Sequence, residues 1–64
     1  MTIAEFKARL REMGLTPSVP IYAGGMVYED RDGQLHNVPD PSMLSPEERE
    51  EIIVVIARII GFED

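Results

Sequence analysis

The side chains able to take part in acid–base or metal chemistry are one histidine, His36, and twelve carboxylates. Cysteine is absent, which excludes disulfides, thiolate metal ligands and a cysteine nucleophile. General acid–base catalysis needs positioned titratable groups with separated pKa values. His36 falls in a predicted strand beside Tyr28, and such a pair without a third group does not make a catalytic site. The sequence therefore predicts a protein that is not an enzyme, with His36 as a half-buried strand residue.

Two short motifs look like ligand-binding loops but lack the residues that would bind the ligand. The run 23–26 contains Gly24 and Gly25, without the lysine of a phosphate loop or a strand-to-helix glycine pattern. The run 30–33 looks like the start of a calcium loop, but proline stands at position 41, where the closing glutamate is needed. Three basic residues near the N-terminus do not make a phosphate track. We therefore expect no cofactor, no metal and no direct contact with nucleic acid.

The charge of the chain is uneven. Residues 1–28 carry three basic and two acidic side chains, a net of +1, whereas residues 29–64 carry ten acidic and three basic side chains, a net of −7. Such a surface repels phosphates and suits a basic surface on another protein. The candidate partner-binding acids form two clusters, Glu29, Asp30 and Asp32 in a predicted turn and Glu47, Glu48, Glu50 and Glu51 at a predicted helix start. The alternative role for these acids is solubility and compensation of the helix dipole.

The first element is predicted as a helix over residues 3–13. Thr2 and Glu5 have the spacing of a capping box, in which each side chain accepts a hydrogen bond from the other residue's amide. Apolar residues follow at spacings of three and four, which is typical of one buried helix face. Gly14 supplies the left-handed residue that ends a helix.

Three strands are predicted near residues 20–23, 26–30 and 34–38. Pro17 and Pro20 exclude a helix in the preceding run. Gly24 and Gly25 favour a two-residue hairpin turn, with a single strand bent at a glycine bulge as the alternative. Pairing of Asp30 with Gln34 places Tyr28 opposite His36 and Met26 opposite Val38. The largely apolar face then comprises Ile21, Ala23, Met26, Tyr28, His36 and Val38.

The last element is predicted as a helix over residues 46–61. Ser45 and Glu48 form a second capping box, and Pro46 suits the first helical position. Residues 52–60 are mostly β-branched and would also suit a buried strand, but no helix breaker occurs before Gly61. On a helical wheel the apolar residues cover roughly 220°, about twice the arc that a surface helix needs. Either the helix is central, or Val54, Val55 and Phe62 are exposed and form an apolar interface, such as that of a homodimer.

Together these elements predict one α+β domain over residues 1–64, in the order helix, two- or three-stranded antiparallel meander, helix. We expect both helices on one face of the sheet, with a core of Ile3, Phe6, Leu10, Met13, Ile52, Ile56, Ile59 and Ile60. The N-terminus lacks the apolar segment of a signal peptide. The apolar run near the C-terminus is about 11 residues, against roughly 20 for a membrane span. We therefore expect a cytoplasmic protein.

In size, acidity, lack of cysteine and lack of a catalytic motif, the chain resembles the small phage-encoded inhibitors of host nucleases, anti-CRISPR proteins among them. The resemblance covers composition only and assigns no role to an individual residue. It implies an inhibitor that occupies a basic, nucleic-acid-binding surface of a partner protein, as a mimic of nucleic acid charge. The alternative function is a small structural or regulatory homodimer formed through the C-terminal helix.

Overall fold

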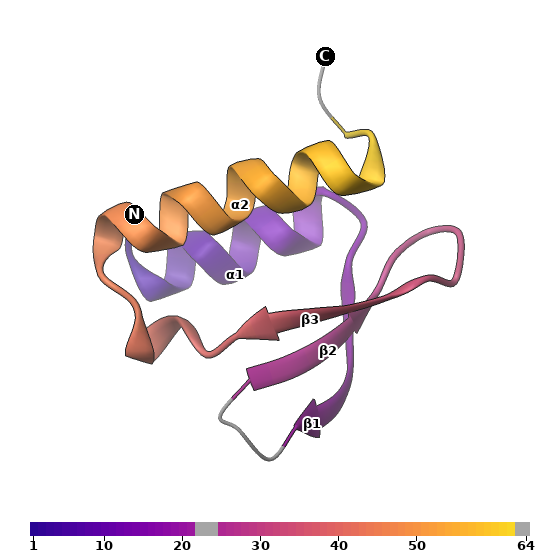
Figure 1. The fold of residues 1–64 in the computed structure, drawn as a ribbon, viewed down its shortest axis with the longest axis horizontal. Helices are drawn as coiled ribbons and strands as arrows, with labels where there is room; N and C mark the ends of the chain where they lie inside the picture. The colour runs from indigo at the N-terminus through magenta and orange to yellow at the C-terminus, as the bar shows by residue number, and fades with distance from the viewer. Residues whose placement is uncertain (22–24, 63–64) are drawn as a thin grey trace.

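The structure, a computed structural model, describes residues 1–21 and 25–62. Helix α1 (Ile3–Glu12) is followed by strands β1 (Thr16–Ile21), β2 (Gly25–Glu29) and β3 (Leu35–Pro39), the short 3-10 helix η1 (Pro41–Met43) and helix α2 (Pro46–Ile60). The strands form one antiparallel sheet in the order β1-β2-β3. The two helices lie side by side with their N-termini at the same end, and the sheet lies to one side of the pair (Figure 1). The predicted α+β class is confirmed.

Both predicted capping boxes are present. The Thr2 amide donates to Glu5 Oε1 at 2.7 Å and the Glu5 amide donates to Thr2 Oγ1 at 3.1 Å. Ser45 and Glu48 exchange the same two bonds at the start of α2. Each helix is followed by a glycine with positive φ, +84° at Gly14 and +72° at Gly61. These local signals set the helix ends within one residue of the predicted bounds.

The β2–β3 hairpin has the predicted register. Tyr28 lies opposite His36 and Met26 lies opposite Val38. The Asp30 amide donates to the Gln34 carbonyl at 2.9 Å, and Gly33 has φ +81° in the three-residue loop between them. This loop type places a left-handed residue before the returning strand, which is why the glycine is found there.

The prediction for β1 is wrong in both its start and its register. The strand begins at Thr16 rather than near residue 20, and Ile21 pairs with Gly25, so the predicted two-residue turn at Gly24 and Gly25 does not form. Gly25 is the first residue of β2. Ala23, which was placed on the apolar face, and Gly24 lie outside the described residues.

The prolines of β1 are tolerated because β1 is an edge strand. Pro17 lies opposite Tyr28, and Pro20 lies opposite Met26. Hydrogen-bonded pairs alternate along an antiparallel ladder, and the Asp30–Gln34 pair is bonded. The backbone N–H and C=O groups of Tyr28 and Met26 therefore point toward β3 and away from the prolines. The proline nitrogens therefore lie on the outer side of β1, where the ladder needs no donor. The two prolines exclude a helix over this run, but they do not indicate where the strand begins, so its start was predicted too late.

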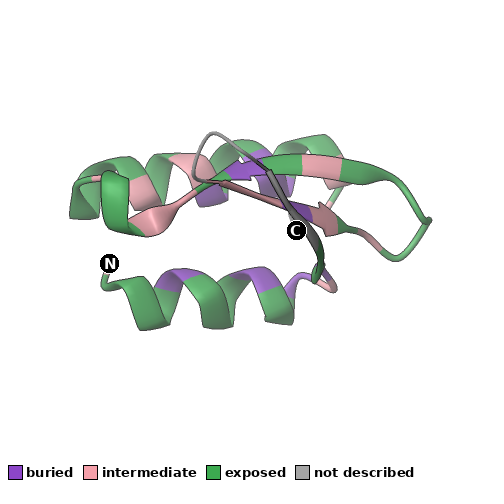
Figure 2. Ribbon diagram, turned by 90° about the horizontal axis from the view of Figure 1, so that it is seen from below, coloured by how far each residue is buried: buried purple, intermediate pink, exposed green. Residues whose placement is uncertain are grey.

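The core joins both helices to one face of the sheet. Its buried members are Phe6, Leu10, Met13, Leu15, Val38, Ile53, Ile56 and Ala57, with Tyr28, Ile52, Ile60 and Phe62 packed against them. Tyr28 and Val38 lie on the same sheet face by the register of β2 and β3. Figure 2 shows the buried positions of α1 on the side of that helix that faces the rest of the molecule. The predicted packing of both helices on one sheet face agrees with this cluster.

Two residues of the predicted core are wrong. Ile3 is 37% exposed and Ile59 is 65% exposed, whereas Ile53 and Ala57 are buried instead. Because α1 packs beside α2, the core side of α2 is turned toward Ile53 and Ala57. Ile59 lies on the other side of the helix and is left in contact with solvent.

Candidate interaction surfaces

Asp30 is an internal hydrogen-bond acceptor. Its Oδ1 accepts from the amides of Asp32 and Gln34, both at 2.9 Å, and its Oδ2 lies 2.7 Å from His36 Nε2. The Asp30 side chain is 9% exposed and that of His36 is 17% exposed. The His36 hydrogen bond, followed by those of the two amides, holds the pKa of the Asp30 carboxyl below its ordinary value. The Asp30 charge is thus committed to shaping the turn.

His36 is a half-buried strand residue beside Tyr28, as predicted. The two residues face each other across β2 and β3, but within the described residues the hydrogen bond of the His36 ring goes to Asp30. Burial raises the pKa of the Tyr28 hydroxyl, with a smaller opposing effect from Arg11. His36 and Asp30 therefore form a structural clamp on the β2–β3 turn.

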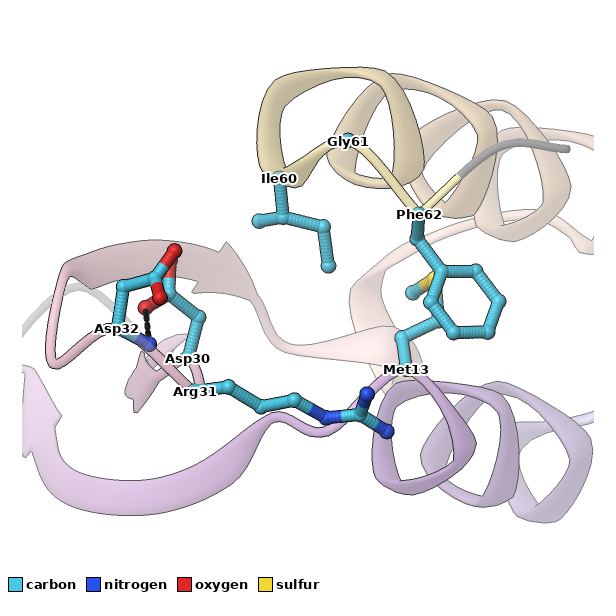
Figure 3. A pocket seen from close by; sticks show the side chains of 7 residues that line it. All are labelled: Met13, Asp30, Arg31, Asp32, Ile60, Gly61 and Phe62. Carbon is cyan, nitrogen blue, oxygen red and sulfur yellow. Dashed lines mark hydrogen bonds between the residues drawn. The ribbon is translucent and has the colours of Figure 1, made fainter.

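The β2–β3 turn lies against the C-terminal ends of the helices. Figure 3 shows Arg31 extending from the turn toward Met13. A Cβ atom added at Gly14 would lie 2.2 Å from Arg31 Nε, so the Arg31 side chain covers the glycine that ends α1. A small cavity of about 180 Å³ remains, lined by Met13, Asp30, Arg31, Asp32, Ile60, Gly61 and Phe62.

The four acids at the start of α2 divide into one that is bonded and three that are not. Glu48 accepts from the Ser45 amide at 2.8 Å as part of the capping box. Glu47, Glu50 and Glu51 are exposed and have no hydrogen bond or ion pair with the residues that the structure describes. Arg49, between them in sequence, turns inward and donates to the carbonyls of Pro41 and Met1 at 2.8 and 3.0 Å.

The two predicted acidic clusters do not share one face. The turn that carries Glu29, Asp30 and Asp32 borders the C-terminal end of α2, whereas Glu47–Glu51 lie at the opposite end of that helix (Figure 1). The nine residue steps from Glu51 to Ile60 span about 14 Å of helix. Whether two acidic segments meet is a tertiary property, and no local pattern in the sequence reports it.

The predicted apolar interface also divides. Val54 is 42% exposed and Val55 is 49% exposed, and with Glu47, Glu50 and Glu51 they line a shallow depression of about 510 Å³. These five residues are called the α2 surface below. Phe62 instead packs against the core of its own chain, with the guanidinium carbon of Arg9 5.6 Å from the ring centroid.

Besides Ile3, sequence reasoning missed three other exposed apolar side chains. Leu35, Met43 and Ile59 are 64%, 78% and 65% exposed. Leu35 is not among the residues of the predicted apolar face, and Ile59 is among those of the predicted core. Exposed apolar residues scattered singly are normal in small domains, so these three residues do not define a site by themselves.

Among residues 1–21 and 25–62, no three histidine or carboxylate side chains are grouped so as to hold a metal ion. Within the same ranges, no helix is long and apolar enough to cross a membrane. Comparison of the chain with protein-family models, curated proteins and solved structures gives no match.

Proposed function

We propose that this protein is a non-enzymatic protein-binding module that uses the α2 surface to bind a basic surface on another protein. The observation that carries the proposal is the grouping, around two exposed valines, of three carboxylates that have no bonded partner among the described residues. Charged side chains of this kind steer association and select partners of opposite charge. The valines add apolar area that leaves water only when a partner covers it.

The valines separate this proposal from a role in solubility alone. Glu47, near the helix N-terminus, is favoured there by the helix dipole whatever the function of the helix. Valine gains nothing comparable, because a β-branched residue loses rotamer freedom in a helix and is a weak helix former. At Val54 and Val55, which are nearly half exposed, folding alone gives little reason for this residue type. Contact with a partner supplies one.

The kind of partner follows from the charge. A protein that binds nucleic acid presents lysine and arginine to the phosphates, and the carboxylates of the α2 surface suit the same basic side chains. We therefore propose an inhibitor that occupies a basic, nucleic-acid-binding surface, as the resemblance to anti-CRISPR proteins implies. The acids of the β2–β3 turn are not part of this contact, because they lie at the other end of α2.

The homodimer is the less supported alternative. Of its three proposed contacts, Phe62 packs against its own chain, which leaves Val54 and Val55. Two copies packed through these valines with their α2 helices parallel would bring Glu47, Glu50 and Glu51 of each copy close together, and like charges across an interface oppose this arrangement. Antiparallel packing would separate the glutamates but would leave them outside the contact. Light scattering at several hundred micromolar protein separates the two functions, since we expect a monomer.

The test begins with site-specific cross-linking in the native host. A photoreactive residue at position 54 is expected to capture the partner, whereas the same residue at position 35, on the exposed Leu35 of the sheet, is not. The captured protein is then purified, and its affinity for this chain is measured between low and physiological salt. We expect the affinity to fall as salt rises.

Two triple variants locate the charge that matters. Glu47→Gln, Glu50→Gln and Glu51→Gln together are expected to weaken binding at least about tenfold, since close charge pairs couple strongly across interfaces. The matched control, Glu12→Gln, Glu29→Gln and Asp32→Asn, removes the same charge from exposed positions elsewhere and is expected to change affinity less than about threefold. Equal effects of the two triples, or binding that salt does not change, would contradict the proposal.

A further inference from the structure

We infer that the segment of the partner that docks on the α2 surface is an α-helix whose lysine or arginine residues and apolar residues follow one another along a single face. This inference rests on the proposed function and names the chemistry of the partner. It follows from the order of the side chains on α2 and from the kind of backbone that such a surface can accept.

The α2 surface is ordered along the helix axis. One row of side chains runs Glu47, Glu51, Val55 at a spacing of four, and the other runs Glu47, Glu50, Val54 at spacings of three and four. Residues at these spacings lie on one helix face. Both rows therefore begin with carboxylates and end, one to two turns later, with a valine. The charged and apolar parts of the surface lie end to end.

A second helix fits this arrangement because side-chain rows at spacings of three and four form the ridges and grooves through which helices pack. The matching face carries basic residues at i and i+4, beside the three glutamates, and apolar residues at i+7 and i+8, beside the two valines. For an antiparallel helix the same order runs in reverse. An ordinary amphipathic helix, with its charges and apolar residues on opposite faces, does not match both parts at once.

An extended peptide fits this surface less well. Strand addition depends on main-chain hydrogen bonds to an open sheet edge, whereas the backbone groups in the middle of α2 are already paired within the helix. Anionic lipid and nucleic acid are disfavoured by the three carboxylates, which carry the same sign as phosphate. A helix with basic residues next to apolar ones satisfies both observations.

The test uses two synthetic alanine-based helical peptides of identical composition. In the first, two lysines at i and i+4 and two leucines at i+7 and i+8 share one face. In the second, the leucines are moved to the opposite face, which preserves charge and helix propensity. Each peptide is titrated into the 15N-labelled full chain, and amide shifts are followed by NMR.

We expect the first peptide to bind with a Kd below about 1 mM, with its largest shifts at residues 47–55. We expect the second peptide to bind the wild-type chain at least about tenfold more weakly. The same loss is expected when the first peptide is titrated into the variant that carries Glu47→Gln, Glu50→Gln and Glu51→Gln. Equal binding of the two peptides, no binding of either, or shifts confined to other elements would overturn this inference. The proposed function would still stand if the partner cross-linked at position 54 kept its dependence on the three glutamates.

Discussion

The β2–β3 turn and the start of α2 are both rich in acids, but the structure uses those acids differently. In the turn, Asp30 accepts hydrogen bonds from two backbone amides and lies 2.7 Å from the His36 ring. At the start of α2, Glu48 caps the helix, while Glu47, Glu50 and Glu51 have no bonded partner among the described residues. The first segment resembles a binding site in sequence and is a structural clamp. The second keeps its carboxylates available.

The difference lies in the backbone to which the acids are attached. A tight loop directs successive N–H groups inward, and an aspartate at its first position satisfies them. In a helix beyond the first turn, the N–H groups are already bonded to carbonyls four residues earlier. A glutamate there has no local donor to accept from and points into solvent. The number of acids in a segment therefore says less about binding than the number of donors within their reach.

The largest expected effect comes from moving the turn away from the helices. Gly14→Ala places a Cβ atom where the Arg31 side chain now lies, and it also imposes a positive φ on alanine. We expect a loss of about 2 kcal/mol in the free energy of unfolding, since the left-handed conformation alone costs about 1–2 kcal/mol. Urea denaturation followed by circular dichroism measures this loss.

Gly61→Ala is the matched control. Its φ is also positive, but an added Cβ atom meets nothing within 4 Å, so we expect the backbone cost alone, about 1 kcal/mol. Gly14→Ala should lose more unfolding free energy than Gly61→Ala, and this difference should shrink when Arg31→Ala is also present. A double-mutant cycle gives this result when two groups are in contact. Equal losses at the two glycines would show that the turn is not held against α1.

The next effect tests whether Asp30 is structural. We expect Asp30→Asn to lower the Tm by several degrees at neutral pH, because it removes the charge to which two amides and the His36 ring are bonded. Asp32→Asn is the control, since the Asp32 carboxylate is exposed and accepts no hydrogen bond from the described residues. A Tm change as large for Asp32→Asn would contradict the division of roles within the turn.

The Tm difference between wild type and Asp30→Asn should also depend on pH. The pKa of Asp30 is lower in the folded chain than its ordinary value of 3.8. Its stabilising contribution is therefore complete above that value and is lost as pH falls through the folded-state pKa. The pKa values of Glu5 and Asp40 are also lowered, by hydrogen bonds from Thr2 and Ser42, so wild type and variant both weaken in acid. The Tm difference between them should narrow below about pH 4.

The features that the sequence predicted correctly depend on residues close together along the chain. The capping boxes join Thr2 to Glu5 and Ser45 to Glu48, three residues apart. The β2–β3 register follows from Asp30 and Gln34, which are four residues apart and flank Gly33. Short-range geometry determines these features, so residue types and spacing suffice to predict them.

The remaining features, including those that were predicted wrongly, depend on which elements lie next to one another. Pro17 excludes a helix, but its place inside a strand follows only once β1 is known to be an edge strand. Ile59 looks like a core residue until α1 is known to pack beside α2, on the helix side that leaves Ala57 buried and Ile59 exposed. Separation of the two acidic clusters likewise required the position of the turn at the far end of α2. No pattern within one segment contains this information.

The smallest expected effect on stability comes from removing the three exposed glutamate charges of the α2 surface. Changing Glu47, Glu50 and Glu51 together to glutamine should alter the free energy of unfolding by less than about 1 kcal/mol, because exposed acids contribute only through the helix dipole, mainly in the first turn. Glu48→Ala, which removes the capping-box hydrogen bond from the Ser45 amide, serves as the reference and should cost a comparable amount with one substitution. Thermal unfolding at low and high salt separates the two, since the dipole effect is screened. A large loss in the triple variant would mean that these carboxylates stabilise the fold as Asp30 does. The carboxylates of the α2 surface would then have a structural role and would not be available to a partner.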